Sequence, residues 1–553
     1  MSSILILLFY YWLIIFSIVG YGILFNQFFL KSLEENIGFI GIYGIFILTL
    51  ISYISSFFIP HTELFNSILL LIGLVNFFYN INKSIIKKNL KNLLIIFFIL
   101  TIFIFVSKNH DDFSYYHFPY THLLTEYSNM LGIGNFNHGF RTHSSIFYLS
   151  SLFNLPFSNF NLFHLSPVFF MGFANIIFYN RILVDLNSKR VSSTLYLSLI
   201  SLVFINVFFY RLAEHGTDRS AMILIIVTII ELFSLINIHR DVNKNSFLKF
   251  IVLITLIISL KTFYILYGLL FIPIIFYFVE KKISIYFFFK SIVTYLCLLM
   301  FISLFTVNFF NTGCLLYPVK FLCFQNFSWS IPLAEVEQMN NWYQQWAKAG
   351  ANPNYRVDNP ELYIKNFNWV SNWIDMYFFN KVSDFLLGLS FLSILTFSIF
   401  FSKKTHTNET PKFFLIYIIL IFLTFAWFYL LPTLRYGGYH LIALLIFIPL
   451  SVHLSKYFVK PNLLKKKVYF LIFLTIIVFY GRNISRLANE YEVYNYNLLN
   501  SAYYRSSEKN LLIYKRVKAI NKCNIENDLS VCSDDYIKAK FLKNSYIYYI
   551  ERK

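Results

Sequence analysis

Long apolar runs follow one another along almost the whole chain, and they constrain its fold more than any other feature. Most of these runs approach the ~20 apolar residues that an α-helix needs to cross a membrane. Overall, 58% of the residues are hydrophobic and 13% are charged, whereas about 25% of a soluble domain is charged. The sequence therefore predicts an all-α fold, a polytopic transmembrane helical bundle of about 14 spans. The predicted spans are 4–29, 38–59, 65–80, 93–107, 163–180, 191–210, 220–238, 247–260, 262–279, 286–310, 377–401, 412–431, 438–456 and 467–480.

Lysine and arginine gather in the short loops between these runs. Loop 81–92, for example, contains Lys83, Lys87, Lys88 and Lys91, and short basic loops are typical of the cytoplasmic side of a membrane. These loops also explain the formal net charge of +19, so we predict a membrane partner and no nucleic acid. With alternating spans, the segments on the non-cytoplasmic side are 108–162, 211–219, 311–376, 432–437 and the tail 481–553.

This orientation depends on the stretch 247–279. Both of its flanks are basic, so the stretch has to cross the membrane twice, with Lys261 at the outer turn. A single crossing would move every later outer segment to the cytoplasm.

Four of the five cysteines form two close pairs on the predicted outer side. Cys314 and Cys323 fall in the long outer loop, and Cys523 and Cys532 fall in the tail. Disulfides persist in oxidising compartments. The placement therefore favours two disulfides over four unpaired thiols.

Two neighbouring acids, Asp111 and Asp112, begin the first outer loop directly after a span. A carboxylate at the hydrocarbon edge is partly desolvated, which raises its pKa and suits a general base. Paired carboxylates are also able to hold a divalent cation. The alternative is a pair of interfacial acids that end a helix and face water.

The remainder of the first outer loop is rich in residues that bind polar ligands. His117 follows the acids, and the stretch 132–145 combines glycine and asparagine with Arg141 and His143. This composition suits a sugar or phosphate site better than a passive connector.

Charged residues also occupy three short outer turns. Glu214 and Asp218 lie in 211–219, and interfacial charge is costly unless it has a partner or a ligand. A self-contained salt-bridge cluster and a ligand site explain them equally well. Lys261 either contacts a phosphate or extends to the interface. Arg435, followed by Tyr436, breaks the cytoplasmic bias of the basic residues, so it is a candidate to bind an anion such as a lipid phosphate.

The outer loop 311–376 is rich in tryptophan. Trp342 and Trp346 are spaced i,i+4, as are Trp369 and Trp373, so each pair shares one helix face. They form either an interfacial aromatic belt or an aromatic lid that stacks on sugar rings.

Several common signatures are missing from the sequence. It contains no P-loop, no dinucleotide-binding fingerprint and no His/Cys cluster with zinc spacing. The inner loops are too short for a nucleotide-sugar domain. A sugar donor for such a chain should therefore be lipid-borne and used on the outer face.

Four motifs occur in order on the predicted outer side. They are Asp-Asp-x-x-x-Tyr-His at 111–117, Glu-x-Gly-Thr-Asp at 214–218, Gly-Cys-Leu-x-Tyr-Pro at 313–318 and Pro-x-x-Arg-Tyr-Gly-Gly at 432–438. The four motifs resemble those of a large bacterial group of membrane proteins, over most of 93–490. Asp111-Asp112 directly after a span, followed by an amphipathic stretch at 117–131, resembles the wider superfamily of type C glycosyltransferases (GT-C). These multi-span enzymes use polyprenyl-phosphate-linked sugars, and an acidic residue in their first outer loop acts as base or metal ligand.

The resemblance implies a function and an organisation. Asp111 or Asp112 would be the catalytic carboxylate, and both are candidate ligands of a divalent metal cation. The enzyme would move a sugar from a polyprenyl-phosphate donor to a glycan, lipid or polysaccharide acceptor at the periplasmic face of the bacterial inner membrane. The candidate substrate-binding residues are His117, Arg141, His143, Glu214, Asp218, Lys261, Arg435 and Tyr436. The implied regions are added N-terminal helices (1–92), a GT-C-like core (93–310), the aromatic loop (311–376), C-terminal helices (377–480) and a small periplasmic tail (481–553).

Two other functions fit parts of the same pattern. An O-antigen or capsule polymerase also has many spans and a large outer loop, but an acidic pair at the start of a loop favours the transferase. A transporter or flippase of lipid-linked glycans predicts charges inside spans and paired repeats, whereas the charges here lie at helix ends.

Overall fold

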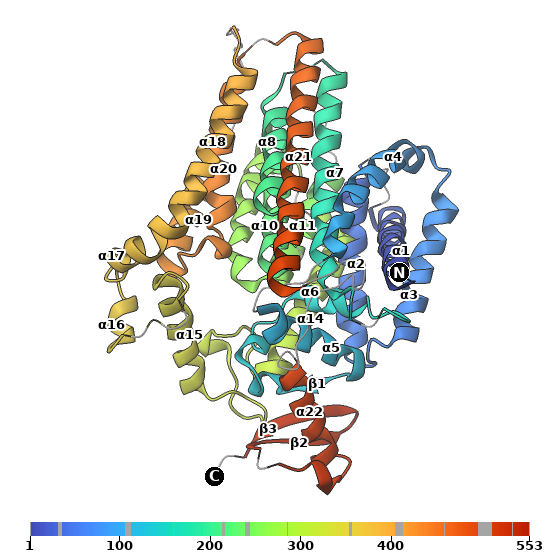
Figure 1. Ribbon diagram of the computed structural model, residues 1–553, viewed down its shortest axis with the longest axis vertical. Helices are drawn as coiled ribbons and strands as arrows, with labels where there is room; N and C mark the ends of the chain where they lie inside the picture. Colours follow the sequence, from blue (N-terminus) through green and yellow to red (C-terminus); the bar gives the residue numbers. More distant parts are fainter. Residues whose placement is uncertain are drawn as a thin grey trace.

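The computed structural model is mostly α-helical (Figure 1). It describes residues 2–30, 36–105, 112–158, 160–189, 191–212, 216–237, 244–284, 286–352, 355, 357–403, 413–457, 459–495, 511–533 and 535–551. The helices are α1 (Ser2–Phe25), α2 (Ile37–Ser56), α3 (Glu63–Asn80), α4 (Ser84–Ile99), α5 (Phe118–Glu126), α6 (Ser145–Ser151), α7 (Ser166–Asn187), α8 (Ser193–Phe208), α10 (Thr217–Asn237), α11 (Lys244–Leu260), α12 (Phe271–Glu280), α13 (Phe287–Lys290), α14 (Ile292–Thr312), α15 (Leu333–Lys348), α16 (Pro360–Ile364), α17 (Val370–Trp373), α18 (Ser383–Phe400), α19 (Phe414–Leu430), α20 (Gly438–Leu454), α21 (Pro461–Tyr494) and α22 (Leu512–Asn524).

Within the described residues, eight helical segments are long and apolar enough to cross a membrane. They are Ile4–Leu30, Ile37–Ser56, Glu63–Asn80, Phe163–Asn187, Thr217–Ile236, Thr262–Glu280, Ile292–Thr312 and Val370–Phe400. Four shorter apolar helices accompany them, at Ser193–Phe208, Asn245–Leu260, Phe414–Leu430 and Gly438–Leu454. The prediction of a polytopic helical membrane protein is therefore confirmed.

The first three helices pack closely because glycines remove side chains from their contacts. A Cβ at Gly20 of α1 would lie 1.8 Å from the carbonyl oxygen of Gly73 in α3. A Cβ at Gly22 would lie 1.7 Å from the carbonyl oxygen of Ile40 in α2. Small residues of this kind let membrane helices approach each other's backbone.

The stretch 247–279 passes through the bundle twice. Helix α11 ends at Leu260, and the 3-10 helix Thr262–Leu270 and α12 carry the chain back. Phe247 near the start of α11 stacks on Phe278 near the end of α12, with ring centres 3.7 Å apart, so the two passes are antiparallel. Lys261 is the residue between them, as the distribution of basic residues predicted.

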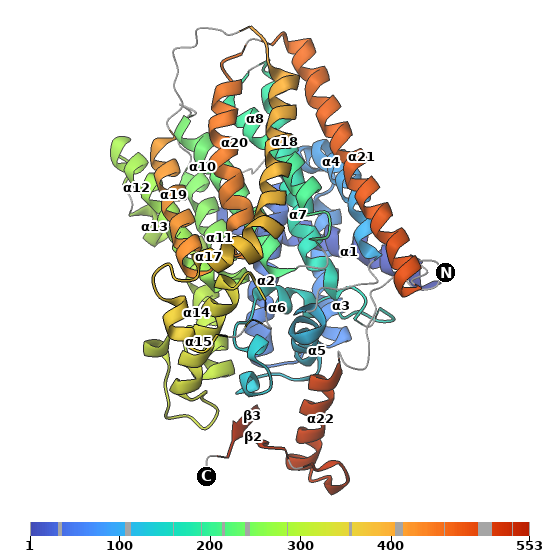
Figure 2. The same cartoon turned by 60° about the vertical axis from the view of Figure 1, so that its left-hand side comes forward.

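The tail folds against the described part of the predicted first outer loop, 108–162. Strands β2 (Ile537–Leu542) and β3 (Ser545–Ile550) form an antiparallel hairpin, and β3 also pairs in parallel with β1 (Met130–Leu131). Helix α22 lies beside α5, at the end of the molecule that carries this sheet (Figures 1 and 2). The end of α18 and the start of α21, which adjoin lysine-rich segments, lie at the opposite end (Figure 1).

Both predicted cysteine pairs are disulfide-bonded in the structure. Cys314 and Cys323 close a small loop directly after α14, and Cys523 and Cys532 close another after α22. Both bonds lie in segments at the end of the molecule that carries the sheet.

Candidate functional site

Four charged residues from four separate segments meet in what we call the ion cluster. Arg435 Nη2 lies 2.6 Å from Asp112 Oδ2, and Arg435 Nε lies 3.1 Å from Asp218 Oδ2. Lys261 Nζ lies 3.0 Å from the other oxygen of Asp218, Oδ1. The structure thus joins four of the residues that the sequence singled out in unconnected turns.

The helix ends at the cluster suit the charges that they carry. Asp218 occupies the first turn of α10, where the helix dipole is positive, and Lys261 directly follows α11, where the dipole is negative. The Asp218 side chain is 4% exposed, whereas those of Asp112 and Arg435 are each 27% exposed. The cluster is therefore buried at Asp218 and open to its surroundings at Asp112 and Arg435.

Three aromatic side chains hold the turn that carries Arg435. Each makes a hydrogen bond to the turn's backbone, in the pairs Trp373 Nε1–Pro432 O (2.8 Å), Trp427 Nε1–Thr433 O (2.7 Å) and Tyr377 Oη–Leu434 N (3.0 Å). A Cβ at Gly438 would lie 2.5 Å from the Trp427 ring. The turn is consequently fixed on one side by indole rings and needs glycine where the ring is closest.

The electrostatics keep both basic residues charged. Burial alone would lower the pKa of Arg435, but the carboxylates of Asp218 and Asp112, together with Tyr436, outweigh it and hold that pKa well above its ordinary value. Burial also opposes the charge of Lys261, and the Asp218 carboxylate again reverses the effect, so the pKa of Lys261 is raised.

His117 lies within the electrostatic reach of the cluster. Burial lowers the pKa of His117 to about 3, and the charges that act on it include Asp112, Arg435 and Asp218. The ring is therefore neutral at physiological pH. It adds a buried, polar but uncharged side chain next to the ion cluster.

Tyr436 lies against both cations, as an immediate neighbour of Arg435 in sequence. Lys261 Nζ is 5.0 Å from the centre of its ring, and the Arg435 guanidinium carbon is 5.5 Å from it. Trp346 of α15 adds a second ring, with its centre 6.0 Å from the guanidinium carbon of Arg435. The i,i+4 spacing links Trp346 to Trp342, but nothing in the sequence places Trp346 next to Arg435.

Arg141 and His143 have other contacts in the structure. Arg141 donates to Glu335 of α15 over 2.6 Å and to the carbonyl of Gly134 over 2.9 Å, so it ties the first outer loop to α15. His143 is buried between the rings of Tyr53 and Tyr148. Both residues support the loop, since a buried guanidinium takes the nearest carboxylate and a neutral imidazole packs as an aromatic ring.

Asp111 and Glu214 lie outside the described residues. In the part of the chain that the structure describes, no group of three or more His, Cys, Asp or Glu side chains could hold a metal ion. The nearby carboxylates of Asp112 and Asp218 are paired with cationic side chains. Because Asp111 is not among the described residues, the divalent cation expected at Asp111 and Asp112 stays a prediction.

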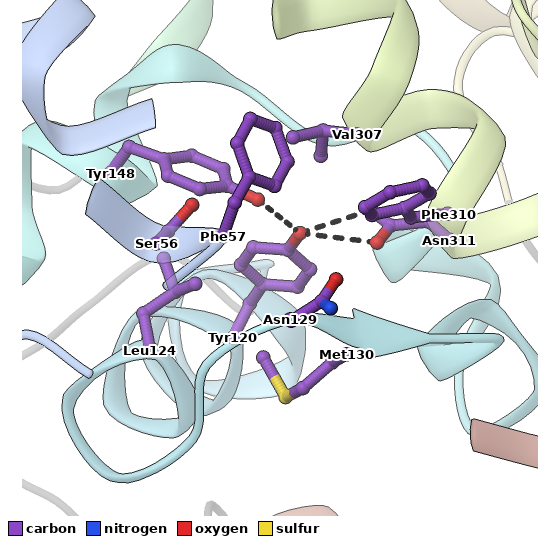
Figure 3. Close-up of a pocket in the computed structure, with 10 residues that line it drawn as sticks. All are labelled: Ser56, Phe57, Tyr120, Leu124, Asn129, Met130, Tyr148, Val307, Phe310 and Asn311. Carbon is purple, nitrogen blue, oxygen red and sulfur yellow. Dashed lines mark hydrogen bonds between the residues drawn. The ribbon is translucent and has the colours of Figure 1, made fainter. Parts of the chain in front are cut away.

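A small cavity under the first outer loop is too narrow to be a substrate site (Figure 3). Its volume is about 20 Å³, enough for about one water molecule. Tyr120 Oη lies 2.9 Å from Tyr148 Oη and accepts from Asn311 Nδ2 over 3.0 Å (Figure 3). This polar contact joins α5, α6 and α14 and so supports the loop that begins at the ion cluster.

A larger cavity, of about 220 Å³, lies between α4, α7, α8 and α21. Its walls are mostly apolar, and the paired amides of Asn175 and Asn206 are among its polar groups. None of its lining residues is a lysine, arginine, aspartate or glutamate. Because no charged side chain lines this cavity, we place the candidate site at the ion cluster.

Comparison with known proteins gives a family and no function. A search of curated proteins and a search of solved structures each found no match. A family model described as "Domain of unknown function (DUF8201)" matches residues 4–443. The match includes the whole ion cluster and ends before the tail. Because it spans well over half of the chain, this protein belongs to the DUF8201 family.

Proposed function

We propose that this chain is a membrane glycosyltransferase. It takes a sugar from a polyprenyl-phosphate donor and attaches it to a glycan, lipid or polysaccharide acceptor at the periplasmic face of the bacterial inner membrane. The observation that carries the proposal is the ion cluster. A partly exposed carboxylate, Asp112, lies 2.6 Å from Arg435, and Asp218 holds Arg435 and Lys261 together as a cation pair suited to a phosphate. The acidic pair Asp111-Asp112 directly after a predicted span, which resembles the type C glycosyltransferases, also supports the proposal.

The side chains of the cluster divide the reaction between them. The acceptor hydroxyl loses its proton to the carboxylate of Asp112, or of its neighbour Asp111, as its oxygen bonds to the anomeric carbon of the sugar. The bond from that carbon to the phosphate oxygen breaks, and the polyprenyl phosphate leaves with the electron pair. Its added negative charge faces Arg435 and Lys261, which stabilise it.

Asp112 and the donor phosphate compete for Arg435 in this scheme. Without donor, Arg435 Nη2 binds Asp112, and a carboxylate in such a pair is a poor proton acceptor. A phosphate that takes over Nη2 frees Asp112 to act as a base. Arg435 keeps its bond to Asp218 through Nε, so it stays in position during the exchange.

The test is single substitution of Asp111 and Asp112 by Asn, and of Arg435 by Lys. Membranes that contain each variant are assayed for transfer of a radiolabelled sugar from polyprenyl phosphate to lipid and glycan acceptors. We expect the rate of sugar transfer to fall by about 10²–10⁴-fold in the variant that removes the general base. Arg435→Lys should also lose most activity, because an ammonium cannot bridge two carboxylates as a guanidinium does.

Binding gives a second readout. Asp112→Asn should bind the bare polyprenyl phosphate at least as tightly as the wild type, because a competitor for Arg435 is gone. Glu337→Gln, on an exposed surface pair with Lys320, is the matched control and should leave transfer unchanged. Full activity in Asp111→Asn and Asp112→Asn alike would exclude the assignment. Activity only on diphosphate-linked oligosaccharides would favour the polymerase instead.

A further inference from the structure

We propose that an aromatic rim beside the ion cluster binds the sugar ring of the lipid-linked donor, an inference that rests on the proposed function. The rim consists of Tyr115, His138, Trp342, Trp346 and Tyr436. It lies between the first outer loop, α15 and the turn that carries Arg435.

Ring contacts run along most of the rim. The centres of Tyr115 and His138 are 5.5 Å apart, and those of His138 and Trp342 are 5.7 Å apart. Trp346 lies one helical turn beyond Trp342 on the same face of α15, and its ring centre is 5.7 Å from that of Tyr436. Residues far apart in sequence thus form one aromatic strip that ends at the ion cluster.

The rim is open, in contrast to the other tryptophan pair of the same loop. Trp369 and Trp373 are 0% and 5% exposed and pack against Phe428. Tyr115 is 48% exposed, and the other four members of the rim are partly exposed. Packing in the interior accounts for Trp369 and Trp373, whereas the rings of the rim remain accessible to a ligand.

The neighbouring cations identify that ligand. The Arg435 guanidinium lies against Trp346 and Tyr436, and Lys261 lies against Tyr436. In a sugar phosphate one oxygen joins the ring to phosphorus, so a phosphate at these cations places the sugar within reach of the two aromatic rings. Aromatic faces carry negative charge density and attract the C–H groups of a sugar ring.

His138 fits the same role. Burial, and to a lesser extent the charge of Arg141, lowers the pKa of His138. The imidazole is therefore predominantly neutral at physiological pH and adds flat surface to the rim instead of positive charge. The rim side chains themselves are uncharged, and Arg435 and Lys261 lie at the Tyr436 end of the rim, which matches a neutral sugar attached to an anionic phosphate.

The test compares two lipids on the purified full-length chain in detergent, polyprenyl phosphate with and without glucose. The wild type should bind the glucose-bearing lipid more tightly. Trp346→Ala should weaken binding of that lipid by about 3- to 10-fold and leave the bare lipid phosphate unchanged. Trp346→Phe, which keeps an aromatic face, should restore most of the difference.

Phe321→Ala is the matched control, because Phe321 lies in the same loop, is 85% exposed and is outside the rim. It should bind both lipids as the wild type does. Equal weakening of both lipids by Trp346→Ala, or no weakening, excludes the sugar subsite, and so does a wild type that prefers neither lipid. If the wild type binds both lipids equally well, the proposed function still holds, provided that Arg435→Met abolishes binding of the bare lipid phosphate. A wild type that binds neither lipid contradicts the proposed function itself.

Discussion

At the scale of single residues, two carboxylates share one arginine but differ in surroundings. Asp218 is almost fully buried and pairs with both Lys261 and Arg435, so it fixes the two cations in place. Asp112 is 27% exposed, so an acceptor hydroxyl can approach it. Carboxylates in unlike environments commonly take separate roles in one site. Under the proposed function, Asp218 positions the two cations and the acidic pair that contains Asp112 takes the proton.

Two buried histidines predict how stability depends on pH. Burial lowers the pKa of His117 and of His143 to about 3, from an ordinary value of 6.5. Between these values the folded chain binds fewer protons than the unfolded chain, so stability is complete above about pH 6.5 and falls as the pH drops toward 3. Each histidine contributes up to about 1.4 kcal/mol per pH unit in that window.

We therefore expect the melting temperature of the detergent-solubilised protein to fall between pH 7 and pH 4.5. His143→Leu, which removes one of the buried titrating groups, should make that fall less steep. The measurement is thermal unfolding at several pH values for both proteins. An equally steep fall in the variant would mean that His143 contributes nothing to the pH dependence.

At the scale of elements, the long outer loop 311–376 supports the turn that carries Arg435. It does so through the turn's backbone at 432–434 and takes no part in the proposed chemistry. The long outer loop supplies Trp373, which donates to the carbonyl of Pro432. The same loop supplies Trp346 to the rim. One loop thus positions Arg435 from the buried side and flanks it from the open side.

Trp373→Phe should loosen that turn. The substitution keeps an aromatic ring but removes one buried hydrogen bond, a loss of about 1 kcal/mol. We expect a small decrease in melting temperature and a clearly weaker binding of polyprenyl phosphate, because Arg435 is less well fixed. Trp369→Phe is the matched control, since Trp369 donates within its own segment, to Asn366. Equal lipid affinity in Trp373→Phe and the wild type would show that the turn holds its shape without this bond.

At the scale of the whole molecule, the tail beyond the DUF8201 match is joined to the loop that begins at the ion cluster. Tyr548 of β3 is fully buried, and its ring centre lies 5.1 Å from that of Phe136. Asn135 donates to the carbonyl of Tyr548, and Tyr514 of α22 stacks on His122 of α5 at 4.4 Å. The tail therefore stabilises the first outer loop.

Tyr548→Ala should detach the tail, because loss of a buried aromatic side chain costs about 3–5 kcal/mol. Hydrogen–deuterium exchange should then increase in the tail and in residues 130–136. Tyr549→Ala is the matched control, since Tyr549 lies on the opposite face of β3 and is partly exposed. If exchange in residues 130–136 stays the same in Tyr548→Ala, the tail does not order this loop.

Much of the fold could be predicted from local composition. The fold class follows because a long apolar segment is most stable inside a membrane, where a helix satisfies all of its backbone hydrogen bonds. The basic flanks of 247–279 also predicted that this stretch passes twice. The structure contains both passes, with Lys261 at the turn between them. The hairpin β2–β3 also has a local sequence signal. Lys543 and Asn544, both with positive φ, form a two-residue turn typical of hairpins.

The sequence by itself determined which residues are unusual, because charge at the end of an apolar run is conspicuous wherever it occurs. Only the tertiary structure decided which of them act together. Asp112, Asp218, Lys261 and Arg435 come from four segments and meet through contacts of high sequence separation. Arg141 and His143 have the same residue chemistry but support the loop instead. Two tryptophan pairs with identical spacing likewise differ, one buried and one open. Spacing defines a helix face, whereas burial depends on what packs against that face.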